Sequence, residues 1–308
     1  MTDQKPNSAE ETENTESNYI PSESVINELG KNFIDEIKEY NPKQPQIIDK
    51  SDEWYFKDFE YVTNSHLKLI REGGPERLKA KQLGLLKEKN TEAYEFGGAF
   101  HCMILEPELF ESRYHVFDDE TICISIGGAK PRGTNKYKEW YQEQLVAASG
   151  KIMIDKEDFE KCMAMAEKVM SIPECYEMIR LCKFEKIVTR EINGVKVKIK
   201  LDGTNFNDFF LDVKTTKDPV SEYAFRYTFK KMGYHRQMSL YSKVAQLKSV
   251  WMLVVEKNYP YSVGLFEIDE ATLALGWQEV FPDLMTYKKY FIDDKKLLDK
   301  PQFTMGVI

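Results

Sequence analysis

The chain has few features of a secreted, membrane-bound or cysteine-clustered protein. No apolar run approaches the roughly 18 residues of a membrane span, and the acidic N-terminus does not resemble a secretory signal. The five cysteines contain no Cys-x-x-Cys pair, which disfavours a zinc ribbon, an iron–sulfur cluster and a disulfide framework. We therefore expect reduced thiols in a cytoplasmic protein without membrane contact.

An excess of basic residues is also missing, but the charge is unevenly distributed. The net charge is −8 over 308 residues. Residues 1–60 hold fifteen acidic residues and six lysines, so the rest of the chain is close to neutral. A neutral body can bind a polyanion through a local basic stripe. Nucleic acid therefore remains a candidate partner.

Composition and periodicity divide the chain into three parts. Residues 1–20, rich in Glu, Thr, Ser and Asn, are expected to form a disordered acidic tail. Residues 21–53 contain apolar residues at helical spacing and then two prolines, which predicts an N-terminal helix and a linker. Residues 54–308 are expected to form one domain.

This domain is predicted to be α/β, with a mixed β-sheet flanked by helices. The hairpin signal Asn193-Gly194 joins the first two strands of a three-stranded meander. A long loop or insertion is expected from residue 118 up to a helix that begins near Lys136, and a single helix is expected over 221–247. The other predicted helices cover 63–70, 95–110, 136–150, 156–170, 173–182 and 270–291, and the predicted strands cover 187–192, 195–202, 209–215, 251–256 and 262–268.

Three charged residues stand where this sheet should be apolar. Asp212 and Lys214 alternate with apolar residues and therefore share one face of their strand. Asp202, at the end of the preceding strand, can reach the same face. Buried charges are costly unless they are paired or bind a metal. An ion pair would account for two of these charges, and Asp202 alone could be a turn residue, but all three together favour a site.

The chemistry of this group suits phosphodiester hydrolysis. Two carboxylates and a backbone carbonyl, most naturally that of Val213, are the hard oxygen ligands preferred by Mg²⁺ and Mn²⁺. A metal ion there would polarise a phosphate oxygen and lower the pKa of a bound water. Lys214 would hold or polarise the attacking water. Nothing in the sequence indicates a covalent nucleophile.

Four ordered blocks then resemble a known nuclease superfamily. Asp202, nine residues and Asp212-Val213-Lys214 resemble the PD-(D/E)xK motif. Residues 97–101 resemble the histidine-bearing helix that precedes the core in RecB-type and phage exonucleases, and residues 233–241 resemble their Gln-xxx-Tyr helix. Residues 62–79 resemble the N-terminal element of the RecE-like (exodeoxyribonuclease VIII, YqaJ-like) branch. One departure is Ile199-Lys200-Leu201, because the family often has arginine before the first aspartate; here Lys198 or Lys200 would supply the positive charge.

The resemblance implies a restriction-endonuclease-like core and assigns roles to individual residues. Metal ligands would be His101, Asp202, Asp212 and the Val213 carbonyl, and the catalytic group would include Lys214 and the accessory acid Glu185, with Glu191 as its alternative. Residues lining the site or touching DNA would be Gln237, Tyr241 and Tyr234. The simpler readings are a buried histidine at position 101 and core packing for the two tyrosines.

The function implied is a Mg²⁺-dependent exonuclease on linear double-stranded DNA in phage-type recombination. Such enzymes work with a single-strand annealing protein, and related exonucleases form homo-oligomeric rings. The alternatives are an endonuclease, a Cas4-like or restriction-type nuclease, or a non-catalytic protein that binds DNA ends. The missing cysteine cluster disfavours the Cas4-like alternative. Cleavage polarity, oligomeric state and the role of the acidic N-terminal segment stay open.

Local basic content supports DNA as the partner. The predicted meander and the helix after it are rich in Lys and Arg, and that helix also carries interleaved aromatic residues. Lysines contact phosphates without reading sequence, and aromatic rings can stack on frayed bases. A solvated helix face with a buried aromatic stripe is the alternative for about half of these side chains.

Overall fold

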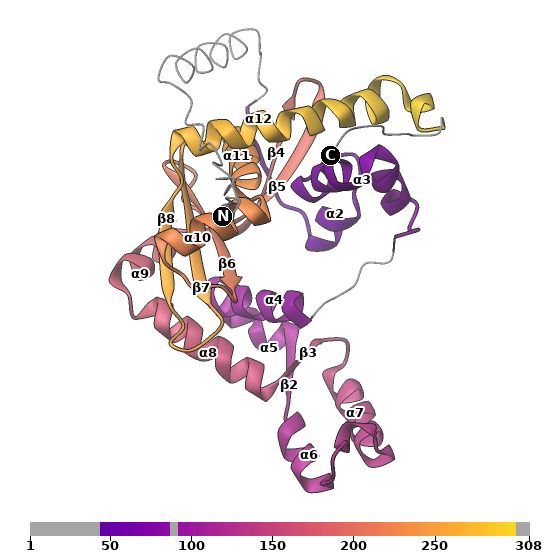
Figure 1. Cartoon of the computed structure of the whole chain (residues 1–308), viewed down its shortest axis with the longest axis vertical. Helices are drawn as coiled ribbons and strands as arrows, with labels where there is room; N and C mark the ends of the chain where they lie inside the picture. Colours follow the sequence, from indigo (N-terminus) through magenta and orange to yellow (C-terminus); the bar gives the residue numbers. More distant parts are fainter. Residues whose placement is uncertain (1–43, 87–91, 300–308) are drawn as a thin grey trace, which may run out of the picture. The chain divides into compact units, whose positions relative to one another are not determined.

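The computed structural model describes residues 44–86 and 92–299, which belong to one compact unit, residues 43–308 (Figure 1). The predicted tail and the predicted helix within residues 22–40 lie outside the described residues. No helix of the described part is both long enough and apolar enough to cross a bilayer.

A six-stranded sheet with the order β1-β4-β5-β6-β7-β8 forms the centre of this unit. Strands β6 and β7 are parallel, and all other neighbours are antiparallel, so the predicted mixed sheet is confirmed. Strand β1 was not predicted. The strands are β1 (Gln46–Ile48), β4 (Lys183–Ile192), β5 (Val195–Thr204), β6 (Phe209–Thr216), β7 (Ser249–Glu256) and β8 (Val263–Glu267).

Helices cover both faces of the sheet. One apolar core joins helices α4, α8 and α9 to the face of β6 that carries Leu211 and Val213. On the other face, α11 contacts β4 and β5, and α12 and α3 lie beyond it (Figure 1). The bounds are α2 (Asp52–Lys57), α3 (Asn64–Gln82), α4 (Glu92–Leu105), α5 (Phe110–Arg113), α8 (Lys156–Met170), α9 (Pro173–Arg180), α11 (Tyr234–Ala245) and α12 (Glu270–Tyr287).

The start of α3 was predicted from its polar cap. Thr63 accepts a hydrogen bond from the backbone N–H of His66, whose side chain lies at the Thr63 backbone N–H in return. This reciprocal capping fixes the first turn of the helix. Gly73 and Gly74 leave helical geometry before Pro75, so the helix is interrupted at that point.

Two helical segments differ in detail from the expectation. The single helix expected over 221–247 is two helices, α10 (Glu222–Met232) and α11, because Gly233 adopts a left-handed conformation with φ 74° and ends α10. Of the long loop or insertion expected after residue 118, the structure has an insertion, with the unpredicted helix α6 (Asp119–Ile126) before α7 (Asn135–Ala148). The side chain of Asp118 caps α6 by accepting from the N–H of Thr121.

A second, two-stranded parallel sheet, also not predicted, joins β2 (Tyr114–Phe117) to β3 (Ile152–Asp155). Helices α6 and α7 lie in the chain between these two strands (Figure 1). Residues 118–151 are therefore an excursion that begins and ends at one small sheet.

Candidate active site

Three acidic residues form a row across three neighbouring strands. The register of β4 and β5 pairs Phe184 with Gly203 and Lys186 with Leu201, which sets Glu185 opposite Asp202. The register of β5 and β6 pairs Gly203 with Leu211, which sets Asp202 opposite Asp212. Residues directly opposite one another share a face of the sheet. Asp202 therefore lies inside β5, two residues before its end, and not at the end as expected.

Backbone pairing between β5 and β6 stops at this row. The paired residues of β5 and β6 are only Gly203 with Leu211 and Thr204 with Phe210. Beyond them, the side chain of Asp202 replaces the ladder bond, since its Oδ2 accepts from the backbone N–H of Val213 at 2.7 Å. The opening leaves the carbonyl of Val213 available to side chains.

Glu185, the acidic residue of β4 in this row, has a strained backbone conformation. Its φ is 53°, in the left-handed region, although it lies within β4 and is not glycine. Such residues cluster at functional sites, where the surrounding structure holds them. The carboxylate forms an ion pair with Lys200, which also lies 3.0 Å from Asp52 of α2. The alternative acid, Glu191, lies opposite Lys196 in the β4–β5 register near the hairpin turn, far along the strand from the row.

Asp212 and Lys214 form a tight pair behind Asp202. Asp212 is 2% exposed, its Oδ2 lies 2.6 Å from Lys214 Nζ, and its Oδ1 accepts from Gln237 Nε2 at 3.1 Å. Burial raises the pKa of Asp212 to about 7, with Lys214 opposing and Asp202 adding to the shift. Burial alone would lower the pKa of Lys214, but the carboxylates of Asp212 and Asp202 raise it above its usual value. Lys214 is therefore an ammonium ion at neutral pH.

His101 reaches this row from α4. Its Nε2 lies 2.6 Å from the carbonyl oxygen of Val213, and its Nδ1 lies 3.8 Å from Asp202 Oδ2. Helix α4 is held in place because the neighbouring Ala99 and Phe100 are fully buried against the sheet.

Part of this group has the geometry of a metal site. One ligand atom each of His101, Glu185 and Asp202 lies within 4.8 Å of the others. Two carboxylates and an imidazole suit a divalent cation such as Mg²⁺ or Mn²⁺. The Val213 carbonyl, already in contact with His101, could add an oxygen ligand. Asp212, expected as a ligand, lies outside this cluster, with its oxygens held by Lys214 and Gln237.

A family profile described as a PDDEXK-like domain of unknown function (DUF3799) matches residues 63–296. The chain belongs to this family. The "putative exonuclease" of Eubacterium rectale is similar in structure, with a TM-score of 0.53, 13% identity and coverage of 84% of this chain and 97% of that protein. The alkaline exonuclease of Laribacter hongkongensis aligns with a TM-score of 0.27, 14% identity and coverage of 63% and 98%. Among curated proteins, no sequence matches.

This membership confirms the resemblance to the PD-(D/E)xK superfamily and the fold class predicted from the sequence. The similarity to the Eubacterium rectale protein supports the fold alone, because the identity is low. Roles of individual residues in this PDDEXK-like protein therefore depend on the geometry of its own site.

The three residues expected to line the site lie next to the Asp212–Lys214 pair. Gln237 donates to Asp212, and Tyr241, 8% exposed, is in hydrogen-bond contact with Gln237. The ring of Tyr234 is centred 5.8 Å from Lys214 Nζ and stacks on Phe225. Tyr241 therefore supports Gln237 from within the core, whereas Tyr234 faces Lys214.

Sequence reasoning missed Tyr55, which helix α2 brings to the same place. Tyr55 is in hydrogen-bond contact with Tyr241, and burial raises its pKa to about 12, with Lys200 opposing the shift. Helix α2 is anchored by Lys198, a fully buried lysine that donates to the carbonyl of Asp58 at 2.7 Å and lies 4.4 Å from the ring centre of Trp54. The only signal in the sequence was the run Trp54-Tyr55-Phe56 before the nuclease-like blocks.

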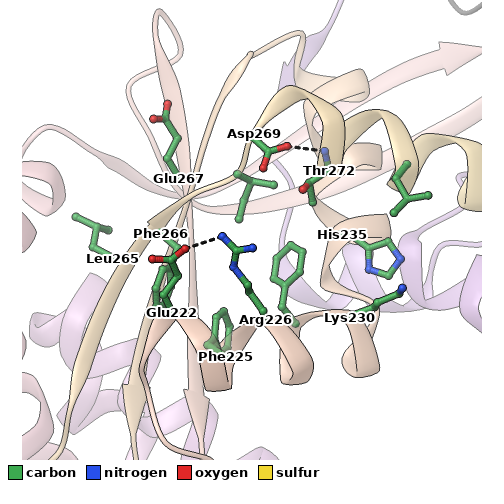
Figure 2. A pocket seen from close by; sticks show the side chains of 13 residues that line it. Glu222, Phe225, Arg226, Lys230, His235, Leu265, Phe266, Glu267, Asp269 and Thr272 are labelled. Carbon is green, nitrogen blue, oxygen red and sulfur yellow. Dashed lines mark hydrogen bonds and ion pairs between the residues drawn. The ribbon is translucent and has the colours of Figure 1, made fainter. Parts of the chain in front are cut away.

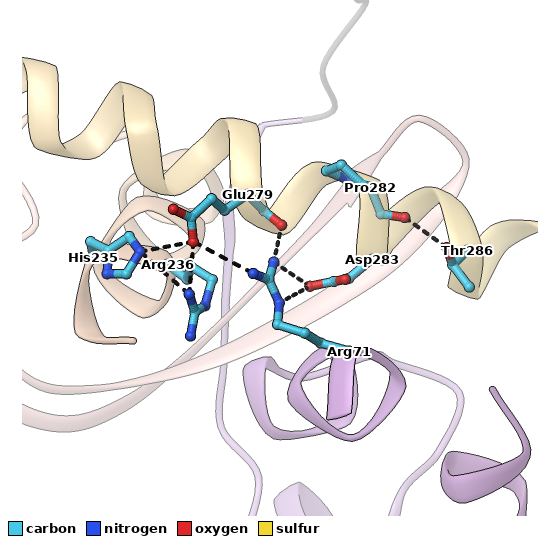
Figure 3. A network of polar contacts seen from close by, with 7 residues as sticks. All are labelled: Arg71, His235, Arg236, Glu279, Pro282, Asp283 and Thr286. Atoms are coloured by element: carbon cyan, nitrogen blue, oxygen red, sulfur yellow. Dashed lines mark hydrogen bonds and ion pairs between the residues drawn. The ribbon is translucent and has the colours of Figure 1, made fainter. Parts of the chain in front are cut away.

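A polar network holds α11, the helix that supplies Gln237 (Figure 3). Glu279 of α12 lies 2.9 Å from His235 Nε2 and accepts from Arg236 Nη1 at 2.7 Å. Arg71 of α3 donates through Nε to Asp283 at 2.8 Å and contacts the backbone carbonyl of Glu279. The network therefore ties α3, α11 and α12 together behind the site.

Proposed function

We propose that this protein is a divalent-metal-dependent deoxyribonuclease that degrades linear double-stranded DNA from an end. The observation that carries the proposal is the convergence of Glu185, Asp202, Asp212 and Lys214 on one face of the sheet, with His101 reaching them from α4. Membership of a PDDEXK-like family supports phosphodiester hydrolysis. The name of the Eubacterium rectale protein supports the exonuclease mode.

In this proposal His101, Glu185, Asp202 and the Val213 carbonyl hold Mg²⁺, for which Mn²⁺ can substitute. The bound metal supplies Lewis-acid polarisation of a phosphate oxygen. Lys214 cannot accept a proton, because its pKa is raised by the adjacent carboxylates. It therefore orients the attacking water and offsets negative charge that develops on the phosphate. Gln237 keeps Asp212 in place so that Lys214 retains its partner.

The finer parts of the proposal concern biology and assembly. We place the protein in the RecE-like branch and in phage-type recombination, where exposed single-stranded tails would pass to a single-strand annealing protein. A homo-oligomeric ring would make degradation processive. These parts are supported by the ordered sequence blocks.

The decisive experiment compares linear duplex DNA, labelled at its 5′ or 3′ ends, with covalently closed circular DNA in Mg²⁺. We expect nucleotide release from the linear substrate, no cut in the circle and no activity in EDTA. Lys214→Ala should lose at least about 100-fold in rate, whereas Lys168→Ala, at an exposed lysine of α8, should match the wild type.

Other results would replace the proposal. Opening of the circle at a comparable rate would show an endonuclease. Tight binding to DNA ends, with equal and negligible cleavage by wild type and Lys214→Ala, would show a non-catalytic end-binding protein.

A further inference from the structure

The outer face of α10 presents aromatic and basic side chains to solvent. Tyr223 is 91% exposed and Tyr227 is 71% exposed. They lie four residues apart and therefore on one side of the helix. Lys231 Nζ lies 5.7 Å from the centre of the Tyr227 ring. The basic residues of this helix, Arg226, Lys230 and Lys231, are all exposed, and Arg226 and Lys230 also line the cavity on the inner side.

These tyrosines are not needed to pack the helix. The inner face of α10 is held by Phe225, which stacks on Phe266 of β8 with ring centres 5.1 Å apart. Phe229 meets Tyr234 edge to face at 6.1 Å. Figure 2 shows this inner face, where α10, β8 and the start of α12 enclose a cavity of about 400 Å³. Since phenylalanines fill the packing positions, the exposed tyrosines are available to a partner.

The charge of this face suits a polyanion. Glu222 is the one acidic residue of α10, and its Oε1 lies 2.6 Å from Arg226 Nη2 (Figure 2). Lys230 and Lys231 thus remain as a positive pair in the last turn of the helix.

We propose that this outer face, defined by Tyr223, Tyr227 and Lys231 and bordered by Lys230 at the rim of the cavity, is a binding track for a DNA strand with unpaired bases. The proposal rests on the nuclease function proposed above. Aromatic rings stack on the faces of bases, which an intact duplex does not expose, whereas the lysines contact phosphates. The track and the catalytic group are also connected along the chain. Helix α10 ends at Gly233, and the next residue, Tyr234, faces Lys214.

The track predicts a selective defect in a Tyr223→Ala/Tyr227→Ala variant. Fluorescence anisotropy in EDTA, without cleavage, would compare a labelled single strand with a blunt duplex. We expect the variant to bind the single strand at least about 10-fold more weakly and the blunt duplex nearly as well as the wild type does. Tyr259→Ala is the matched control, because Tyr259 is 86% exposed in the β7–β8 connection. Thermal melting should show equal stability for all three proteins.

A second variant tests the electrostatic half of the track. Lys230→Gln/Lys231→Gln should lower the slope of log affinity against log salt for the single strand by about 1.4, at roughly 0.7 per phosphate contact. The binding track is disproved if the salt slope of the lysine variant is unchanged. It is also disproved if the tyrosine variant binds the single strand as tightly as the wild type does. Neither result contradicts the nuclease function. An equal loss on blunt duplex would overturn the preference for unpaired bases. If the wild type neither binds nor cleaves DNA, the proposed function itself fails.

Discussion

Asp212 is a carboxylate in a position where an uncharged side chain would be more stable. It is 2% exposed, and burial raises its pKa to about 7. For a raised folded-state pKa, the stability gained by protonation is complete below the unfolded-state pKa of about 4 and is lost as pH rises through about 7. The protein thus retains a destabilising charge next to Lys214, as expected of a group kept for function.

We predict that Asp212→Asn, measured in EDTA, has a higher melting temperature than the wild type at pH 8 and a similar one at pH 5. The reason is that asparagine cannot acquire the buried negative charge. Thermal melts between pH 5 and 8 would show a smaller slope for the variant, and the same protein should be inactive in Mg²⁺. Asp208→Asn, at an exposed turn residue, should follow the wild type. If the melting temperatures of Asp212→Asn and the wild type change with pH in the same way, the pKa of Asp212 is not raised to about 7.

The accessory acid can be identified by comparing two glutamates of one strand. Glu185 lies with His101 and Asp202, whereas Glu191 lies opposite Lys196 near the hairpin turn. We predict that Glu185→Gln weakens Mn²⁺ binding by about 10-fold or more, because a charged ligand is lost. Isothermal titration without DNA would measure this affinity. Glu191→Gln is the matched control and should bind Mn²⁺ like the wild type; the reverse result would move the accessory role to Glu191.

Helix α11 depends on Glu279, which connects it to α12. Removing this carboxylate leaves His235, 2% exposed, and Arg236 without their shared acceptor. Loss of hydrogen bonds at a buried group costs about 1–3 kcal/mol. We therefore predict that Glu279→Ala lowers the free energy of unfolding by that amount, as measured by urea denaturation. It should also lower kcat, because Gln237 on the same helix holds Asp212.

The control for this prediction is an exposed ion pair. Glu177 and Arg180 of α9 lie 2.6 Å apart with side chains more than half exposed. Such pairs contribute about 0–1 kcal/mol, so Glu177→Ala should be nearly neutral. Equal destabilisation by the two substitutions would show that the Glu279 network has no special role in holding α11.

The meander was predictable from sequence because period two and Asn193-Gly194 are local signals. Asn193 and Gly194 have φ of 49° and 77°, as a tight hairpin turn requires. The break at Gly233 was missed, although two lysines followed by a glycine are a recognised signal for the end of a helix. The contribution of Tyr55 was hidden, because it depends on contacts between α2 and the sheet, far apart in sequence.

For the candidate site, spacing brought Asp202, Asp212 and Lys214 together, but only the register showed that Glu185 continues their row. The left-handed φ of Glu185 has no sequence signal, since glutamate rarely adopts it. The place of Glu185 thus required the structure, because it depends on the pairing of strands. Asp212 and Lys214, two residues apart on one strand, could be predicted to share a face.

Charge is divided unequally along the whole molecule, with ten acidic and three basic residues in residues 1–42. The remainder, which contains the site, is nearly neutral. A tethered acidic segment repels DNA and competes with it for basic side chains, and this effect is screened beyond about 8 Å at physiological salt. We predict that deleting residues 1–42 raises DNA affinity several-fold at about 50 mM salt and changes it little at about 500 mM. Fluorescence anisotropy with a labelled duplex at both salt concentrations would measure the change.

The matched control keeps the segment but replaces its ten acidic residues by Asn or Gln, which separates charge from chain length. This neutralised protein should bind DNA like the deletion, because electrostatic competition depends on charge. If the neutralised protein instead binds like the wild type, the segment acts through its bulk. If neither change alters affinity at low salt, the acidic segment does not restrain DNA binding, and recruitment of a partner such as an annealing protein becomes its better explanation.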